Sequence, residues 1–132
     1  MKKFLILAIL LLPSWVMGQV TINEIMYDLD GADTGREWVE VQNNSSDIID
    51  FTTYKFREAN TNHGLNLVQG NGSLPIGGYA IIANDSSKFL TDWPSYSGIL
   101  FDSSFSLNNT GETLSLVDAS LAEVDTVTYD AT

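Results

Sequence analysis

The residues best able to do chemistry in this chain concentrate in one acidic stretch, YDLDGADTGREWVEVQN, which covers residues 27–43. It carries five carboxylates around two glycines and a tryptophan: Asp28, Asp30, Asp33, Glu37 and Glu40. Ca²⁺ binds carboxylate oxygens, and crowded carboxylates repel one another unless a cation or water screens them. Three interpretations follow, namely a calcium loop, an acidic catalytic cluster, or a solvated turn between two strands.

The spacing argues against an EF-hand-type calcium loop. Such a loop needs acidic or amide ligands at positions 1, 3 and 5, glycine at position 6 and glutamate at position 12. Counted from Asp28, Asp30 fits position 3, but Ala32 and Val39 occupy positions 5 and 12, and position 6 is not glycine. A solvated turn is therefore the favoured interpretation. A looser calcium site formed by Asp28, Asp30 and Asp33 stays open as the alternative.

Catalytic interpretations find little support in the residue pattern. Glycoside hydrolysis needs two carboxylates that face each other, whereas Glu37 and Glu40 have opposite strand parity and point to opposite faces. The one histidine, His63, lies in the polar segment NTNHGLN, which reads as a solvated loop, and there is no cysteine. We therefore predict no catalytic residue, no cofactor and no enzyme.

Two aromatic residues are the preferred binding candidates. Trp93 and Tyr96 flank Pro94 in the segment DWPSYSG, which carries the signals of a loop. Binding residues are disproportionately found on loops, whereas the other aromatics alternate with apolar neighbours and are expected in the core. We predict that Trp93 and Tyr96 form an exposed contact patch.

The first 18 residues have the layout of a secretory signal peptide. Lys2 and Lys3 precede the apolar run FLILAILLL, and PSWVMG follows it. The run is shorter than the ~20 residues that a membrane-spanning helix needs, which disfavours an uncleaved anchor. We predict cleavage between Gly18 and Gln19, no membrane span afterwards, and a secreted or cell-surface protein, with the periplasm as the alternative location.

Charge and length define the mature chain, residues 19–132. Without the signal peptide it has four basic against seventeen acidic residues, a formal charge of −13. Phosphate backbones require clustered Lys and Arg, but the four basic residues are scattered, so nucleic acid is excluded as a partner. The chain has no cysteine. Its stability must therefore come from a core, for which one domain of this length suffices.

The elements that must position these residues are mostly strands. QVTINEIMY alternates with a phase shift that predicts a bulge, and EWVEVQN places Val39 and Val41 on one face. GYAIIAN and GILF predict buried strands. Between them, DSSKFLTDW predicts one or two helical turns, capped by Asp85 or Ser86 and stopped by Pro94. ETLSLVDASLAEVDTVTYD predicts a hairpin. Short strands with recurrent turns indicate an all-β, antiparallel sandwich.

Four segments in this order resemble the lamin-tail domain family, in particular its bacterial secreted members. They are INEIMYD, DTGREWVEVQN, LPIGGYAIIAN and LNNTGETLSLVD with VDTVTY, and together they span roughly residues 20–129. The resemblance implies an immunoglobulin-like β-sandwich. It also implies that the acidic stretch connects the first two strands, with Trp38 at the edge of the core.

These observations predict a non-enzymatic, exported module for adhesion, surface display or protein–protein contact, with an unknown protein or polysaccharide as its partner. A fold does not by itself specify a function. Two alternatives stay open. The chain could be the N-terminal fragment of a larger secreted nuclease or hydrolase, since such domains accompany hydrolase domains in bacteria, or it could be a small calcium-dependent secreted hydrolase that uses the acidic stretch.

Overall fold

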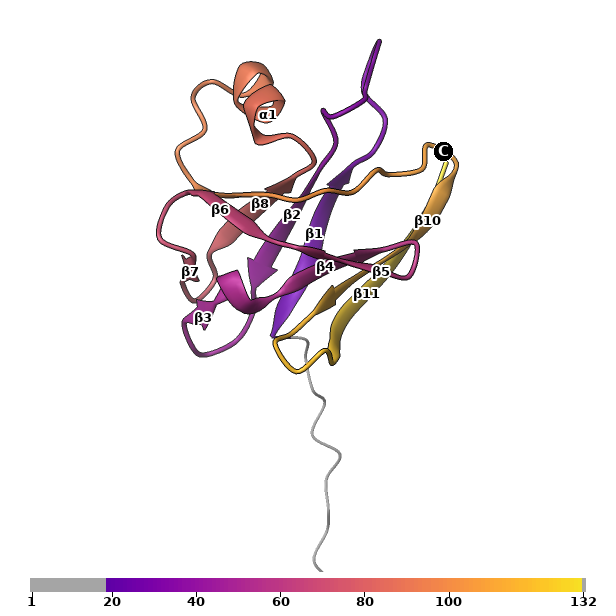
Figure 1. The fold of residues 1–132 in the computed structure, drawn as a ribbon. Coiled ribbons are helices and arrows are strands. Elements are labelled where there is room, and N and C mark those ends of the chain that lie inside the picture. The colour runs from indigo at the N-terminus through magenta and orange to yellow at the C-terminus, as the bar shows by residue number, and fades with distance from the viewer. Residues whose placement is uncertain (1–18, 132) are drawn as a thin grey trace, which may run out of the picture.

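A computed structural model describes residues 19–131 of the protein, in which two β-sheets pack face to face (Figure 1). The five-stranded sheet has the order β1-β2-β8-β9-β6, formed by Val20–Met26, Trp38–Asn43, Tyr79–Ala83, Ile99–Asp102 and Asn66–Gln69. The four-stranded sheet has the order β11-β10-β4-β5, formed by Glu123–Asp130, Gly111–Val117, Lys55–Glu58 and Thr61–Gly64. The remaining elements are short: β3 (Ile49–Asp50), β7 (Ser73–Leu74), the 3₁₀ helix η1 (Phe51–Thr53) and the helix α1 (Ser86–Asp92).

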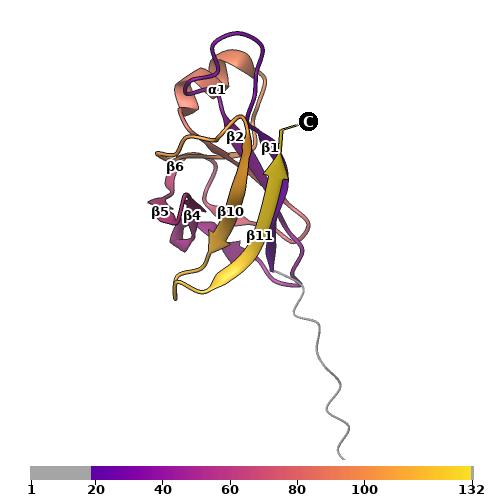
Figure 2. The same ribbon diagram turned by 90° about the vertical axis from the view of Figure 1, so that its right-hand side faces the viewer.

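This architecture confirms the predicted all-β, immunoglobulin-like sandwich. The two sheets form separate layers, with β10 and β11 in front of β1 and β2 in Figure 2. Val39 and Val41 of β2 are fully buried between the layers, as their alternation predicted, and meet Phe56, Leu114 and Leu116 of the facing sheet. The predicted signal peptide lies outside the described residues.

The strand β8 is buried on both faces, which explains its uninterrupted apolar sequence. Ala80 and Ile82 point into the core between the sheets. Ile81 and Ala83 point the other way, into a second cluster under α1 that includes Phe89. The five-stranded sheet is therefore covered on its outer face at the α1 end, and this second cluster supplies the floor of the site described below.

One pairing departs from the predicted antiparallel arrangement. The strands β8 and β9 run parallel, with Ala80 opposite Ile99 and Ala83 opposite Asp102. Parallel neighbours require a crossover connection, usually helical, and residues 84–98, which contain α1, provide it. The sequence predicted the two strands and the helix between them. It did not reveal their relative direction, because both strands are apolar on both faces.

The ends of α1 agree with the sequence. Asp85 is the N-cap, and its carboxylate accepts hydrogen bonds from the backbone N–H groups of Ser87 and Lys88 at 3.0 and 3.1 Å. Trp93 closes the helix one residue before Pro94. Such a cap contributes about 1 kcal/mol to helix stability. The helix thereby presents Asp92 and Trp93 at its C-terminal end, over the outer face of the sheet.

The bulge predicted in β1 is confirmed. The register between β1 and β2 shifts between Ile22 and Glu24, and the Ile22 N–H donates instead to the carboxylate of Asp125 on β11 at 2.7 Å. All members of the main core lie between Val20 and Tyr129. Residues 19–131 therefore contain their own hydrophobic core, which is the property that lets a domain fold alone.

Candidate functional site

A cavity of about 460 Å³, which we call the Trp93 cavity, lies on the outer face of the five-stranded sheet. Phe89 and Asp92 of α1 contribute to its lining, and α1 projects at the same end of the sandwich as the loop between β1 and β2 (Figure 1). Small-ligand and side-chain pockets have volumes of about 300–1,000 Å³. The cavity is lined by Glu24, Met26, Trp38, Glu40, Ile81, Phe89, Asp92, Trp93, Pro94, Ser95 and Tyr96.

Four aromatic rings build the wall of the cavity. Trp38 meets Phe89 and Trp93 edge to face, with centroid distances of 6.0 and 6.2 Å. Phe89 meets Tyr96 in the same way at 5.2 Å. Edge-to-face pairs add about 0.5–1.5 kcal/mol each to the burial of their surface and hold the rings in fixed orientations. Trp93 stays 46% exposed, so its ring is open to a ligand.

The lining of the cavity also carries carboxylates. Glu24 on β1 and Glu40 on β2 are direct cross-strand partners, and both line the cavity. Like charges placed directly opposite in a sheet destabilise it. None of the ion pairs formed within residues 19–131 includes either glutamate. Glu40 accepts a hydrogen bond from the side-chain amide of Asn23 at 2.6 Å. The pair therefore presents two negative charges that no cation of the described chain neutralises.

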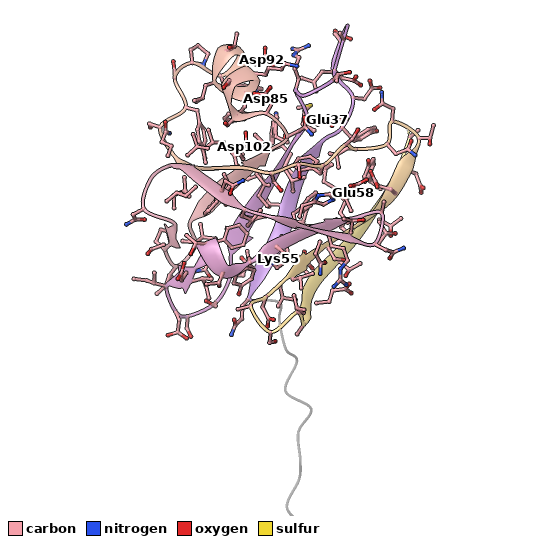
Figure 3. All side chains as sticks on the ribbon, in the orientation of Figure 1. Glu37, Lys55, Glu58, Asp85, Asp92 and Asp102 are labelled. Atoms are coloured by element: carbon pink, nitrogen blue, oxygen red, sulfur yellow. The ribbon has the colours of Figure 1, made fainter. Side chains whose placement is uncertain are left out.

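The third carboxylate of the cavity is already neutralised. Asp92, at the C-terminal end of α1 (Figure 3), accepts from Arg36 Nε at 2.8 Å. Arg36 also donates through Nη1 to the carbonyl oxygens of Asp30 and Ala32, at 3.3 and 3.2 Å. This arginine thus ties the loop between β1 and β2 to Asp92 of α1, which belongs to the cavity lining.

Two details show that the cavity wall is polar as well as aromatic. Burial, together with the negative charge of Glu40, raises the pKa of Tyr96 to about 12, and its hydroxyl donates to the carbonyl of Ile99 at 2.9 Å. Tyr96 is therefore a neutral donor at any physiological pH. Trp38 is 6% exposed, and its Nε1–H is the one buried side-chain donor within residues 19–131 without a partner. A buried donor left unsatisfied costs about 1–3 kcal/mol.

The acidic stretch forms a connected loop rather than a converging ligand set. The side-chain amide of Asn109 donates to Asp33 at 2.7 Å and reaches Asp28 at 3.5 Å. Asp30 takes part through its carbonyl oxygen, which faces Arg36. Within residues 19–131, no three His, Cys, Asp or Glu side chains gather closely enough to hold a metal ion. The loop thus has internal partners for two of the three aspartates proposed as calcium ligands.

Glu37 stands apart from that loop, inside the sandwich (Figure 3). Its side chain is buried, and Oε2 accepts from the backbone N–H of Leu107 at 3.1 Å. Burial raises the pKa of Glu37 above its ordinary value. The Leu107 bond opposes the rise, and the negative charges of Asp33, Glu112 and Glu58 add to it. The group ties the segment before β10 to the start of β2.

The sequence comparison agrees with this architecture. The model of the Lamin Tail Domain family matches residues 15–131, nearly the whole chain. The chain belongs to the lamin tail domain family. A comparison with curated proteins found no match. The loop between β1 and β2 is therefore the strand connection that the resemblance implied, and Trp38, at the start of β2, lies in the lamin tail domain's second cluster.

Trp93 and Tyr96 of this lamin tail domain both line the Trp93 cavity. They are unequal, because Trp93 is exposed whereas Tyr96 is half buried. Sequence reasoning missed Trp38, Glu24 and Glu40 as their companions. One signal was present: Trp38 and Glu40 share a parity on β2 opposite to that of the core valines, so they had to lie on the outer face.

Two further observations complete the survey of residues 19–131. His63 is not in a solvated loop: it lies on β5, half buried, with Nε2 at 3.0 Å from the carboxylate of Glu58. Its segment forms a hairpin with β4, which turns at Ala59 and Asn60 with positive φ angles that the sequence did not indicate.

No helix within residues 19–131 is long and apolar enough to cross a membrane.

Proposed function

We propose that this lamin tail domain is an exported, non-enzymatic module that holds a partner protein in the Trp93 cavity, for adhesion, surface display or protein–protein contact. The observation that carries the proposal is the cavity itself. It combines an exposed tryptophan with two carboxylates that no cation in residues 19–131 neutralises. Sites with one exposed aromatic and a few placed polar groups are typical of recognition.

Two further observations support the remaining parts of the proposal. The lamin tail domain is a non-catalytic, immunoglobulin-like domain, which favours binding over catalysis. Export rests on the N-terminal pattern of two lysines, an apolar run and small residues up to Gly18.

Export is tested on the full chain in a bacterial host. The protein is recovered separately from the cytoplasm, the periplasm, the cell surface and the medium, and its N-terminus is sequenced. We expect the chain outside the cytoplasm to begin at Gln19. A full-length chain that starts at Met1 and stays in the cytoplasm contradicts the export part of the proposal.

Contact through the cavity is tested by adding the purified chain from residue 19 to cells of the producing strain that lack the gene. We expect saturable attachment, which Trp93→Ala weakens about tenfold, as loss of a central aromatic does. The matched control is Ile48→Ala. Ile48 is 67% exposed and follows the far end of β2, so the cavity keeps its lining. Equal attachment of the two variants contradicts the proposal.

A further inference from the structure

Resting on the proposed function, we infer that the Trp93 cavity binds an arginine side chain presented by a short basic segment of the partner protein. The inference concerns the chemistry of the occupant. It depends on two properties of the cavity: a cross-strand pair of glutamates that takes part in no ion pair within residues 19–131, and aromatic rings in the same lining.

Glu24 and Glu40 supply negative charge to the cavity lining. As cross-strand partners they hold their Cβ atoms about 4.5–5.5 Å apart, and their mutual repulsion is relieved by a cation placed between them. No ion pair within residues 19–131 includes either glutamate; Arg36 pairs with Asp92, and Arg57 with Glu123. A cation from outside is therefore the complementary ligand.

Aromatic rings belong to the same lining as the two glutamates. Cations are attracted to the faces of Trp and Tyr rings, and the attraction strengthens where water is excluded. The ring of Trp93 is the exposed one of the Trp38–Trp93 pair, with 46% of the residue accessible against 6% for Trp38. Trp93 is therefore the ring available to a cation.

Arginine fits these walls better than lysine does. A guanidinium is planar, stacks on aromatic faces and is less strongly hydrated than an ammonium group. It also carries five N–H donors, so that one group can reach two carboxylates at once. Its alkyl stem packs against Met26 and Ile81, which supply the apolar part of the lining. A volume of about 460 Å³ leaves room for a neighbouring residue of the same segment.

The test is a titration of the chain from residue 19 with defined probes, followed by the fluorescence of its tryptophans. The first probe is a capped pentapeptide, Gly-Leu-Arg-Leu-Gly. The second has citrulline in place of arginine, which keeps the shape and removes the charge. The third is a neutral glucose hexasaccharide. We expect the arginine peptide to bind at least about tenfold more tightly than the citrulline peptide, and more weakly as salt rises from about 20 to 300 mM.

Matched variants connect that binding to the cavity. Glu24→Gln and Glu40→Gln remove charge and keep the side-chain shape, and each is expected to weaken the arginine peptide about tenfold. Asp47→Asn removes the same charge from an exposed position beyond the far end of β2 and is expected to leave binding unchanged. Equal thermal midpoints of the variants show that all of them are folded.

Each outcome decides between the two proposals. Equal binding of the arginine and citrulline peptides, or absent binding of both, overturns the arginine inference. The proposed contact function is then tested separately by the Trp93→Ala attachment experiment. Saturable binding of the hexasaccharide that Trp93→Ala abolishes also overturns the inference, because the partner is then a polysaccharide. The inference is also overturned if Asp47→Asn weakens binding as much as Glu24→Gln does. Binding then depends on the overall charge of the protein and not on the cavity.

Discussion

The backbone N–H of Ile22 donates a hydrogen bond to the carboxylate of Asp125, 103 residues further along the chain, at 2.7 Å. Ile22 stands at the bulge in β1, where the register with β2 shifts. Asp125 lies on β11, the edge strand of the other sheet. A bulge leaves a backbone group unpaired, and here a carboxylate from the facing layer satisfies it. The same bond joins two edges of the sandwich.

Removal of that carboxylate is expected to destabilise the domain. Asp125→Ala leaves the Ile22 N–H without its partner, and hydrogen bonds to charged groups contribute about 1.5–3 kcal/mol. Asp125→Asn retains an oxygen acceptor and should lose about half as much. The free energy of unfolding in urea measures both. Asp47→Ala serves as the control, and a loss for Asp125→Ala no larger than that of the control contradicts this role.

The raised pKa of Glu37 predicts that the free energy of unfolding of the domain depends on pH. Burial raises its pKa in the folded state, so the folded protein holds this proton at pH values where the unfolded chain has released it. The free energy of unfolding therefore falls as the pH rises from the ordinary pKa of about 4.5 through the raised one. Every tenfold difference in proton affinity between the folded and unfolded states corresponds to about 1.4 kcal/mol.

The variant Glu37→Gln isolates this effect. Its amide oxygen can still accept from Leu107, and the group does not titrate. We expect the difference in unfolding free energy between variant and wild type to move in favour of the variant as the pH increases from about 4 to 8, as urea titrations at several pH values would show. A constant difference across that range contradicts the raised pKa of Glu37.

Gly→Ala substitutions at two glycines distinguish the energetic cost of backbone strain from that of steric overlap. Gly31 and Gly111 both have positive φ angles, 87° and 103°. An added Cβ at Gly31 meets nothing within 4 Å, whereas at Gly111 it overlaps the carbonyl oxygen of Tyr129 on β11. Gly31→Ala should cost about 1–2 kcal/mol for the backbone alone. Gly111→Ala should cost clearly more, because β10 and β11 must separate. Equal losses in urea unfolding contradict this assignment.

The acidic loop is expected to be insensitive to calcium. Asn109 already contacts Asp28 and Asp33, and Arg36 braces the segment around Asp30. The thermal midpoint of the chain from residue 19 should therefore be equal in calcium and in chelator at one ionic strength. A ligand at a hundredfold excess over its Kd adds about 2.7 kcal/mol to stability. An upward shift with calcium that Asp30→Ala abolishes would make the loop a metal site.

The local pattern of the chain predicted most of the elements. The bulge in β1, the alternation of β2, the cap of α1 at Asp85 and the final hairpin all follow from residues close together in sequence. Each depends on a local rule: side-chain parity, a capping oxygen, or turn residues between apolar runs. The resemblance to lamin tail domains then arranged these elements into two sheets.

The short segments were harder to predict from the sequence. The stretch IIDFTTYKFRE forms β3, η1 and β4 in succession, and two of these elements have only two or three residues. His63 was placed in a loop, yet it pairs with Glu58 across a hairpin. A two-residue strand has no periodicity to read, and a hairpin of polar residues is held by backbone bonds and cross-strand pairs rather than by an apolar face.

By itself, the sequence determined that this protein is a β-sandwich with an acidic loop between its first two strands, because alternation and turn chemistry depend on neighbouring residues. Only the tertiary structure decided that β8 and β9 are parallel, that Asp125 caps the bulge at Ile22, and that Glu24 and Glu40 line one cavity together with Trp38 and Trp93. These facts depend on which strands become neighbours. That choice is made by the packing of the whole core, since each strand presents equally usable edges to several partners.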